Sequence, residues 1–143
     1  MILTGTYERT LDAKGRLALP AAIRKDLSDQ VYVVPAPDVD ALYVFSDDEY
    51  ESWVMGLFER RGGFDPRSRE DQRLMRRVNA MAVPMEIDKT SRIGLSEQLR
   101  GKAHLSREVT VVGNYDHLEI WDRATWERTQ AADDDDLTDL FFS

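Results

Sequence analysis

An internal repeat constrains the fold of this chain more than any other feature of its sequence. Residues 11–19, LDAKGRLAL, recur as residues 87–95, IDKTSRIGL, 76 positions further along the chain. The same offset aligns Glu51 with Glu127, well beyond this segment. A correspondence of this length indicates one structural module that is used twice. In each copy an Asp-x-x-x-Arg segment separates two apolar runs, so we expect two related charged tips to form the working surface.

The length of the chain limits how independent the two copies can be. A chain of 143 residues fits one domain or two small modules. A copy of roughly 60–70 residues would be marginal alone because it buries too little of its surface. We therefore expect one shared core. We place a first module at residues 4–50, connecting helices at 51–81, a second module at 82–130 and an acidic tail at 131–143.

Several classes of protein are excluded by what the sequence lacks. It contains no cysteine, which excludes disulfides and thiolate zinc sites. No apolar run approaches the roughly 20 residues that span a bilayer. The first residues have neither the basic region nor the apolar stretch of a signal peptide. We therefore expect a cytoplasmic protein with no membrane partner.

The sequence also offers no constellation for catalysis. His104 and His117 are too few and too isolated for a metal site or a catalytic triad. Phosphate-binding, dinucleotide-binding and nucleophile-elbow motifs are missing. Asp12 and Asp88 could form a catalytic pair, but an aspartate that opens a turn normally accepts backbone amide bonds. We expect no enzyme, no metal, no cofactor and no small-molecule substrate.

The charge of the chain is unevenly distributed. The net charge is −8, and the tail after Ala131 contributes five aspartates and no basic residue. Residues 60–77 instead hold seven arginines against three acidic residues. At helical spacing, four of them fall on one exposed face: Arg69, Arg73, Arg76 and Arg77. This face is either simply solvated or a secondary contact for phosphate or for another subunit.

The first tip has the pattern of a tight turn. Asp12 opens it and Gly15 closes it, which is typical of a type I turn, and glycine tolerates the positive φ that such a hairpin often needs. Arg16 then starts the next strand. In the second copy Ser91 stands where the first has Gly15. If this position requires positive φ, serine costs up to about 1–2 kcal/mol; otherwise the second tip uses another turn.

The segments around the tips predict strands and short helices. Pro20 and Ser96 can each begin a helix, and Ser46 to Glu49 has the pattern of a capping box. A longer helix is expected over about residues 68–81. The β-branched and aromatic runs predict strands at residues 31–34, 41–45, 109–112 and 118–121.

With both tips in view, the chain closely resembles the MraZ family of bacterial transcriptional regulators, in the SpoVT/AbrB-like superfamily. The resemblance covers roughly residues 1 to 130. It is carried by Gly5-Thr6-Tyr7, by the first tip and Leu19-Pro20, by the Asp88 and Arg92 of the second tip, and by Leu118-Glu119-Ile120-Trp121-Asp122. A single Asp-x-x-Gly-Arg would be weak evidence, whereas two copies at this spacing are specific.

The resemblance implies a fold and a function. The fold would be mainly β with short helices, as tandem swapped-hairpin AbrB-like modules that form one pseudo-two-fold β-barrel. The protein would be a ring-like homo-oligomer associated with the nucleoid. Its partner would be double-stranded DNA, read at short G-rich direct repeats upstream of its own cluster of cell-division and cell-wall genes.

The resemblance also places the DNA contacts in the two tips. The contact residues would be Lys14, Arg16 and Arg92, with Lys89 as a further basic residue nearby. Asp12, Gly15 and Asp88 would shape the turns. An arginine on a hairpin tip can enter the major groove, where its fork pairs with guanine O6 and N7. A lysine there would touch phosphate. The alternative is that these residues are only exposed charges at strand ends.

A second function stays open on the sequence alone. AbrB-like folds also serve as antitoxins, and a protein-interaction module of that type would dock its partner on the acidic tail. The tail carries Leu137, Leu140, Phe141 and Phe142, which could anchor it. Its aspartates could also compete with DNA for the arginine tips.

Overall fold

Two antiparallel β-sheets carry the fold of the computed structural model, which describes residues 2–133 and 137–142. The larger sheet has the strand order β1-β7-β8-β4-β3-β5. Its strands are β1 (Thr6–Thr10), β3 (Gln30–Pro35), β4 (Ala41–Ser46), β5 (Val83–Glu86), β7 (Glu108–Asn114) and β8 (His117–Asp122). The smaller sheet pairs β2 (Arg16–Ala18) with β6 (Arg92–Gly94). The fold is mainly β with short helices, as the resemblance implied.

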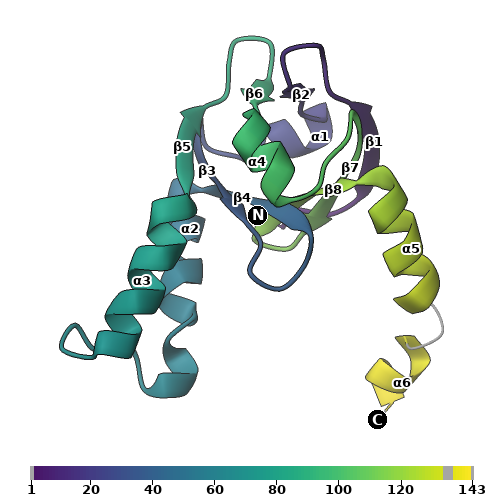
Figure 1. The fold of residues 1–143 in the computed structure, drawn as a ribbon. Coiled ribbons are helices and arrows are strands. Elements are labelled where there is room, and N and C mark those ends of the chain that lie inside the picture. The colour runs from purple at the N-terminus through teal and green to yellow at the C-terminus, as the bar shows by residue number, and fades with distance from the viewer. Residues whose placement is uncertain (1, 134–136, 143) are drawn as a thin grey trace.

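The helices are distributed around these sheets (Figure 1). They are α1 (Ala21–Arg24), α2 (Asp47–Gly56), α3 (Arg69–Met81), α4 (Glu97–Lys102), α5 (Arg123–Asp133) and α6 (Leu137–Phe142), with a 3-10 turn η1 (Glu59–Arg61). The short helices α1 and α4 cover the sheet on the side of the β2–β6 ribbon, while α2–α3 and α5–α6 form two legs that extend away from it. No helix in the described ranges is long and apolar enough to cross a membrane.

The sequence repeat is visible in the topology. The elements β1, β2, α1, β3, β4 and α2 recur in the same order as β5, β6, α4, β7, β8 and α5. Under this correspondence the six-stranded sheet has the same order from either edge, with β4 and β8 at its centre. The first strand of each copy pairs with the other copy, because β1 lies beside β7 and β5 beside β3. The copies therefore share one sheet.

The expected barrel is not closed among the described strands. β1 and β5 are the two edges of the large sheet, and β2 and β6 pair only with each other. Side chains fill the space between the two sheets instead. Leu17 and Ile93 of the ribbon and Leu118 and Ile120 of β8 are all at most 1% exposed and belong to one core cluster. Apolar packing, rather than a continuous ladder of hydrogen bonds, holds the ribbon on the sheet.

A second apolar cluster joins the α2–α3 leg to the sheet. Phe45 of β4 stacks on Trp53 of α2 at 4.8 Å between ring centroids, and Val54 and Val78 are buried beside them. The start of α3 was expected at about residue 68. Ser68 is indeed its N-cap, with a side chain that accepts a hydrogen bond from the Asp71 amide. This leg is therefore a packed extension of the domain.

Two local expectations fail where tertiary contacts compete. Ser46 is the N-cap of α2 but makes no capping hydrogen bond, because its hydroxyl accepts one from the Ser28 amide at 3.0 Å. The capping-box prediction was wrong for this reason. In the tail, Leu140, Phe141 and Phe142 are 74–86% exposed, so they do not anchor it to this chain. Asp134, Asp135 and Asp136 lie outside the described residues.

Candidate nucleic-acid interface

The β2–β6 ribbon brings the two tips side by side at one end of the molecule (Figure 1). Leu17 pairs with Ile93 in the antiparallel register. Backbone hydrogen bonds from Leu95 to Gly15 and from Leu19 to Ser91, each 2.9 Å, extend the pairing beyond the strands. The sequence repeat thus places residues 12–16 and 88–92, which we call the first and second tips, on one surface.

The first tip is organised around the carboxylate of Asp12. Its Oδ1 accepts hydrogen bonds from the backbone amides of Lys14 and Arg16, each at 2.9 Å. The Gly15 amide donates to the Asp12 carbonyl, which closes the turn. The expectation that Asp12 accepts backbone bonds is thus met, and its Oδ1 is committed to the turn.

The same carboxylate also positions the side chain of Arg16. Arg16 Nε donates to Asp12 Oδ2 at 2.7 Å, and the arginine side chain is 36% exposed. Both partners are charged, and charge-assisted hydrogen bonds of this kind are short and strong. This bond uses Nε, while within the described part of the chain no partner is recorded for the terminal Nη atoms of Arg16. Those atoms are the pair that a guanidinium offers to a guanine edge.

The second tip holds its arginine differently. Asp88 Oδ1 accepts from the amides of Thr90 and Arg92, each at 2.9 Å, as Asp12 does in the first tip. Arg92 Nε, however, donates to the hydroxyl of Thr90 at 2.8 Å and lies 3.5 Å from Asp88 Oδ2. Thr90 stands where the first tip has Lys14, and sequence reasoning missed its role. Nothing in a single sequence indicates that a threonine at the position of Lys14 would hold the neighbouring arginine.

The backbone answers the question left open at Ser91. Its φ is +61°, and that of Gly15 is +78°, so both tips use the left-handed region at this position. A side chain at Gly15 would also collide, since a Cβ there would lie 2.6 Å from the Leu95 carbonyl oxygen. Serine carries a conformational cost at this φ that glycine does not. The second tip keeps the turn of the first at a higher cost.

The hydrogen bonds of the tips lower the pKa of both aspartates. The pKa of Asp12 is lowered from its usual 3.8 to about 2, and the largest cause is the hydrogen bond from the backbone amide of Arg16. The pKa of Asp88 is lowered likewise, mainly by the backbone amide of Arg92. Both carboxylates therefore stay ionised at neutral pH, so each tip combines a fixed anion with an arginine.

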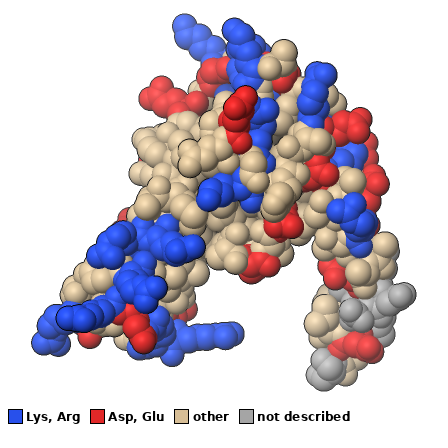
Figure 2. Space-filling view, in the orientation of Figure 1, with Lys and Arg blue, Asp and Glu red and all other residues tan. Residues whose placement is uncertain are grey.

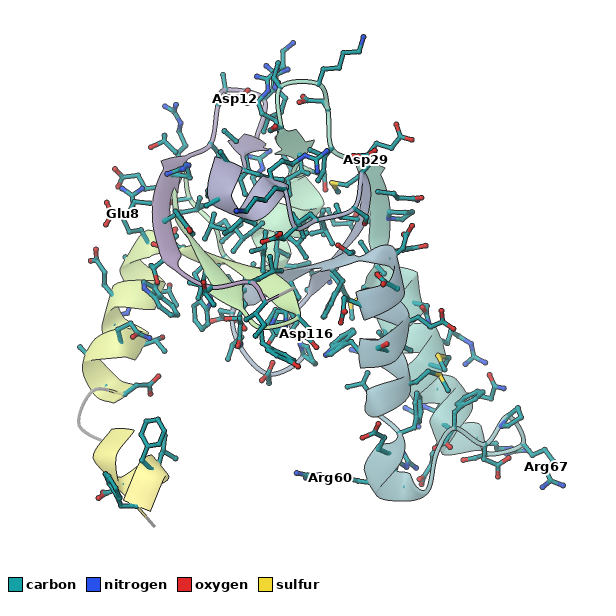
Figure 3. The ribbon with its side chains drawn as sticks, turned by 180° about the vertical axis from the view of Figure 1, so that it is seen from behind. Glu8, Asp12, Asp29, Arg60, Arg67 and Asp116 are labelled. Atoms are coloured by element: carbon teal, nitrogen blue, oxygen red, sulfur yellow. The ribbon has the colours of Figure 1, made fainter. Side chains whose placement is uncertain are left out.

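The other basic residues of the expected site lie in two places. Lys14 and Lys89 are exposed on the tips. The exposed arginines of α3 lie instead on the leg at the opposite end of the molecule (Figure 2). Figure 3 labels Asp12 at the tips and Arg60 and Arg67 at the far end of that leg. One DNA duplex on the tips of a chain would not reach the arginines of the same chain's leg.

Nothing in the described residues forms a metal centre, since no three histidine, aspartate or glutamate side chains are placed to hold an ion there. A buried polar cluster does exist on β8, between the two legs. His117 Nδ1 lies 2.7 Å from Asp116 Oδ1, and His117 Nε2 lies 3.0 Å from Glu119 Oε2. Trp121 Nε1 donates to the same glutamate at 2.9 Å. Sequence reasoning missed this cluster because His117, Glu119 and Trp121 lie on a strand recognised by its apolar residues, and Asp116 lies in the turn before it.

Comparison with known proteins identifies the chain's relatives. Residues 2–74 and 80–140 match the family model described as "MraZ protein, putative antitoxin-like". A relative from Spiroplasma kunkelii, named "Transcriptional regulator MraZ", is 32% identical over 127 residues, which cover 89% of this chain and 86% of that protein. Both tips lie within the matched segments. The chain therefore belongs to the MraZ family.

Proposed function

We propose that this protein is a transcriptional regulator that binds double-stranded DNA in a sequence-specific manner, with the two tips as its reading surface. The observation that carries the proposal is that the β2–β6 ribbon, in which Arg16 faces Gly94 and Arg92 faces Ala18, brings both arginines to Asp12 Oδ2, at 2.7 and 3.5 Å. The name of the Spiroplasma relative supports the same function. Because the chain belongs to a family whose Spiroplasma member is named a transcriptional regulator, we propose no enzymatic activity.

The geometry of the tips fits direct reading of guanine. Two-stranded ribbons fit the major groove of B-DNA. Asp12 fixes Arg16 through Nε, so the guanidinium loses little further freedom when its Nη atoms pair with guanine O6 and N7. Lys14 and Lys89, which are exposed beside these arginines, would contact phosphate. Phosphate contacts fix the register on the duplex, and base contacts select the sequence.

Two arginines favour guanine-rich targets, and we propose short G-rich direct repeats upstream of the protein's own division and cell-wall gene cluster. A single site read by two arginines would bind weakly. A homo-oligomer that lines up successive ribbons would raise the effective concentration of each ribbon, provided the spacing of the repeats matches that of the tips. Affinity should therefore increase sharply with the number of repeats in phase. Such a regulator would act on the nucleoid in the cytoplasm.

The exchange of edge strands supports an interpretation of the fold as two swapped-hairpin AbrB-like modules. Strand β1 of the first repeat pairs with β7 of the second, and β5 of the second pairs with β3 of the first. We keep the modules at residues 4–50 and 82–130, joined by 51–81 and followed by the tail at 131–143. Because each module completes the sheet of the other, neither tip should fold in a single module.

The test is fluorescence anisotropy with the DNA directly upstream of the gene and a scrambled duplex of the same composition. Arg16→Ala should abolish the preference for the upstream duplex. Arg128→Ala, which removes an exposed arginine on α5 far from the tips, should leave it intact. A salt series gives the number of phosphate contacts. Equal binding of both duplexes by the unmodified protein would overturn the proposal.

A further inference from the structure

Three of the arginines of α3 line a groove that the proposed DNA surface does not use. This groove, of about 690 Å³, is lined by Arg61, Arg73, Leu74, Arg76, Arg77 and Ala80 together with Glu70. We call it the arginine groove. It lies on the leg formed by α2 and α3, at the opposite end of the molecule from the tips (Figure 2).

The charge of the arginine groove is only partly balanced by the chain itself. Arg61 pairs with Glu70 at 2.7 Å and with the buried Asp71 at 3.2 Å. Across the described ranges, no ion pair is recorded for Arg73, Arg76 or Arg77. Arg76 and Arg77 follow Arg73 by three and four positions on one helix. Like charges at these spacings destabilise a helix. An anionic partner would remove this repulsion.

The C-terminal segment has the complementary chemistry. After Arg128 the sequence has no basic residue and five aspartates, Asp139 among them. In α6, Leu140, Phe141 and Phe142 are 74%, 76% and 86% exposed. Three consecutive exposed apolar side chains on one short helix indicate a contact surface. An acidic segment with adjacent aromatic side chains suits a groove of arginines with an apolar floor, because guanidinium groups bind carboxylates and also stack on aromatic rings.

The groove cannot receive this segment from its own chain while α5 holds its position. The start of α5 is fixed by Arg123, whose Nη2 donates to the Arg9 carbonyl at 2.7 Å. Trp126 packs on Trp121 with ring centroids 5.3 Å apart. Helices α5 and α6 extend on the opposite side of the molecule from α2 and α3 (Figures 1 and 3). The segment is therefore presented outward, where a second copy can meet it.

We propose that the C-terminal segment of one copy docks in the arginine groove of a second copy. Asp139 pairs with Arg76, between Arg73 and Arg77, and the phenylalanines pack on Leu74 and Ala80. Each copy then offers one groove and one segment, so the contact is head-to-tail and can be repeated from copy to copy. The tips stay free on the opposite end of every copy.

Because the chain has no cysteine, engineered thiols can test this contact without background. We would place Ala80→Cys in the groove of one full-length protein and Leu140→Cys in the tail of another that carries a mass tag. Mixing the two under mild oxidation should give a mixed disulfide between the tagged and untagged chains. Lys25→Cys, exposed at the end of α1, replaces Ala80→Cys as the matched control. A yield no higher than this control would overturn the proposal.

Reversing the charge on each side of the proposed contact distinguishes specific docking from chance collision. Arg76→Glu in the Ala80→Cys protein should lower the yield of mixed disulfide severalfold, and Asp139→Arg in the Leu140→Cys protein should restore it. Lys25→Glu, a charge reversal outside the groove, should change nothing. All of these positions are on the surface, so each variant should fold, which circular dichroism checks. Failure of Asp139→Arg to restore the yield would count against the assigned pairing.

Other occupants of the groove would give different results. If Arg76→Glu weakens binding of the upstream duplex as strongly as Arg16→Ala and leaves the disulfide yield unchanged, the groove is a DNA contact and the proposal fails. It also fails if the thiol at position 80 captures a foreign protein in place of the tail. Disulfide yield and DNA affinity are measured separately, so this proposal and that of DNA reading can fail independently.

Discussion

Arg92 Nη1 lies 3.5 Å from Asp12 Oδ2, the same oxygen that accepts the hydrogen bond from Arg16 Nε. One carboxylate oxygen of the first tip therefore faces the arginines of both tips, although Asp12 and Arg92 are 80 positions apart in sequence. The two tips are coupled through this oxygen. A change at Asp12 should consequently affect both copies of the repeat.

The first prediction concerns stability in acid. The pKa of Asp12 falls from 3.8 to about 2 on folding, so the stabilisation by its carboxylate is complete above about pH 4 and is lost as the pH falls toward 2. The melting temperature of Asp12→Asn should thus lie below that of the unmodified protein at neutral pH, and the difference should shrink between about pH 4 and pH 2. Differential scanning fluorimetry across this range measures it. A difference that stays constant to pH 2 would contradict the assigned pKa.

The second prediction concerns the strained turn of the second tip. Ser91 has φ of +61°, a conformation that costs an ordinary residue about 1–2 kcal/mol. Ser91→Gly should therefore raise the melting temperature by a few degrees, partly offset by the greater chain entropy of glycine when unfolded. Calorimetry of the two proteins measures the shift, and an unchanged or lower value would show that the serine is not strained.

The matched control for Ser91→Gly is the replacement of glycine by a residue with a side chain at the equivalent position of the first tip. Gly15 has φ of +78°, and a Cβ there would lie 2.6 Å from the Leu95 carbonyl oxygen. Gly15→Ala should consequently lower the melting temperature by more than Ser91→Gly raises it, because strain and a steric clash add. It should also disturb the bond from the Leu95 amide to the Gly15 carbonyl. Equal and opposite shifts at the two positions would argue against the clash.

The repeat made much of the local structure predictable. Strands β2 and β6, and strands β4 and β8, begin and end 76 positions apart, and the cap by Ser96 forms as expected, with a bond from the Leu99 amide. These features depend on residues close in sequence. A turn that begins with aspartate and a helix that begins with serine need few distant contacts.

The parts that escaped prediction depend on contacts between distant residues. A repeat shows that two copies are alike but not which strands they exchange, so the pairing of β1 with β7 could not be derived from it. The hydroxyl of Ser46 had two possible partners, and the choice of the Ser28 amide depends on how β3 and α2 pack. Likewise, the link between Asp12 and Arg92 exists only because the ribbon joins the copies.

The third prediction tests how Arg16 reads DNA. Arg16→Lys keeps the charge but loses the planar fork that pairs with guanine O6 and N7. The dissociation constant for the upstream duplex should rise about 5- to 150-fold, as expected for one lost bidentate contact, while the salt dependence stays the same. Arg92→Lys is the matched variant, and its loss should be smaller because Arg92 Nε is held by the neutral Thr90 hydroxyl. Anisotropy titrations at several salt concentrations measure both. Full affinity in Arg16→Lys would show that Arg16 contributes only its charge.

The last prediction concerns the buried cluster on β8 and stability in alkali. Burial acts to lower the pKa of His117, but its hydrogen bonds to Glu119 and Asp116 outweigh burial and raise the pKa above 6.5. The stabilisation by protonated His117 is therefore complete below about pH 6.5 and is lost as the pH rises through the higher pKa of the folded protein. His117→Gln removes this titration. From neutral to alkaline pH, the melting temperature of the unmodified protein should fall more steeply than that of His117→Gln. Parallel curves would mean that His117 is already neutral in the folded protein, and the ring would then act only by packing on Tyr43, 4.4 Å away between centroids.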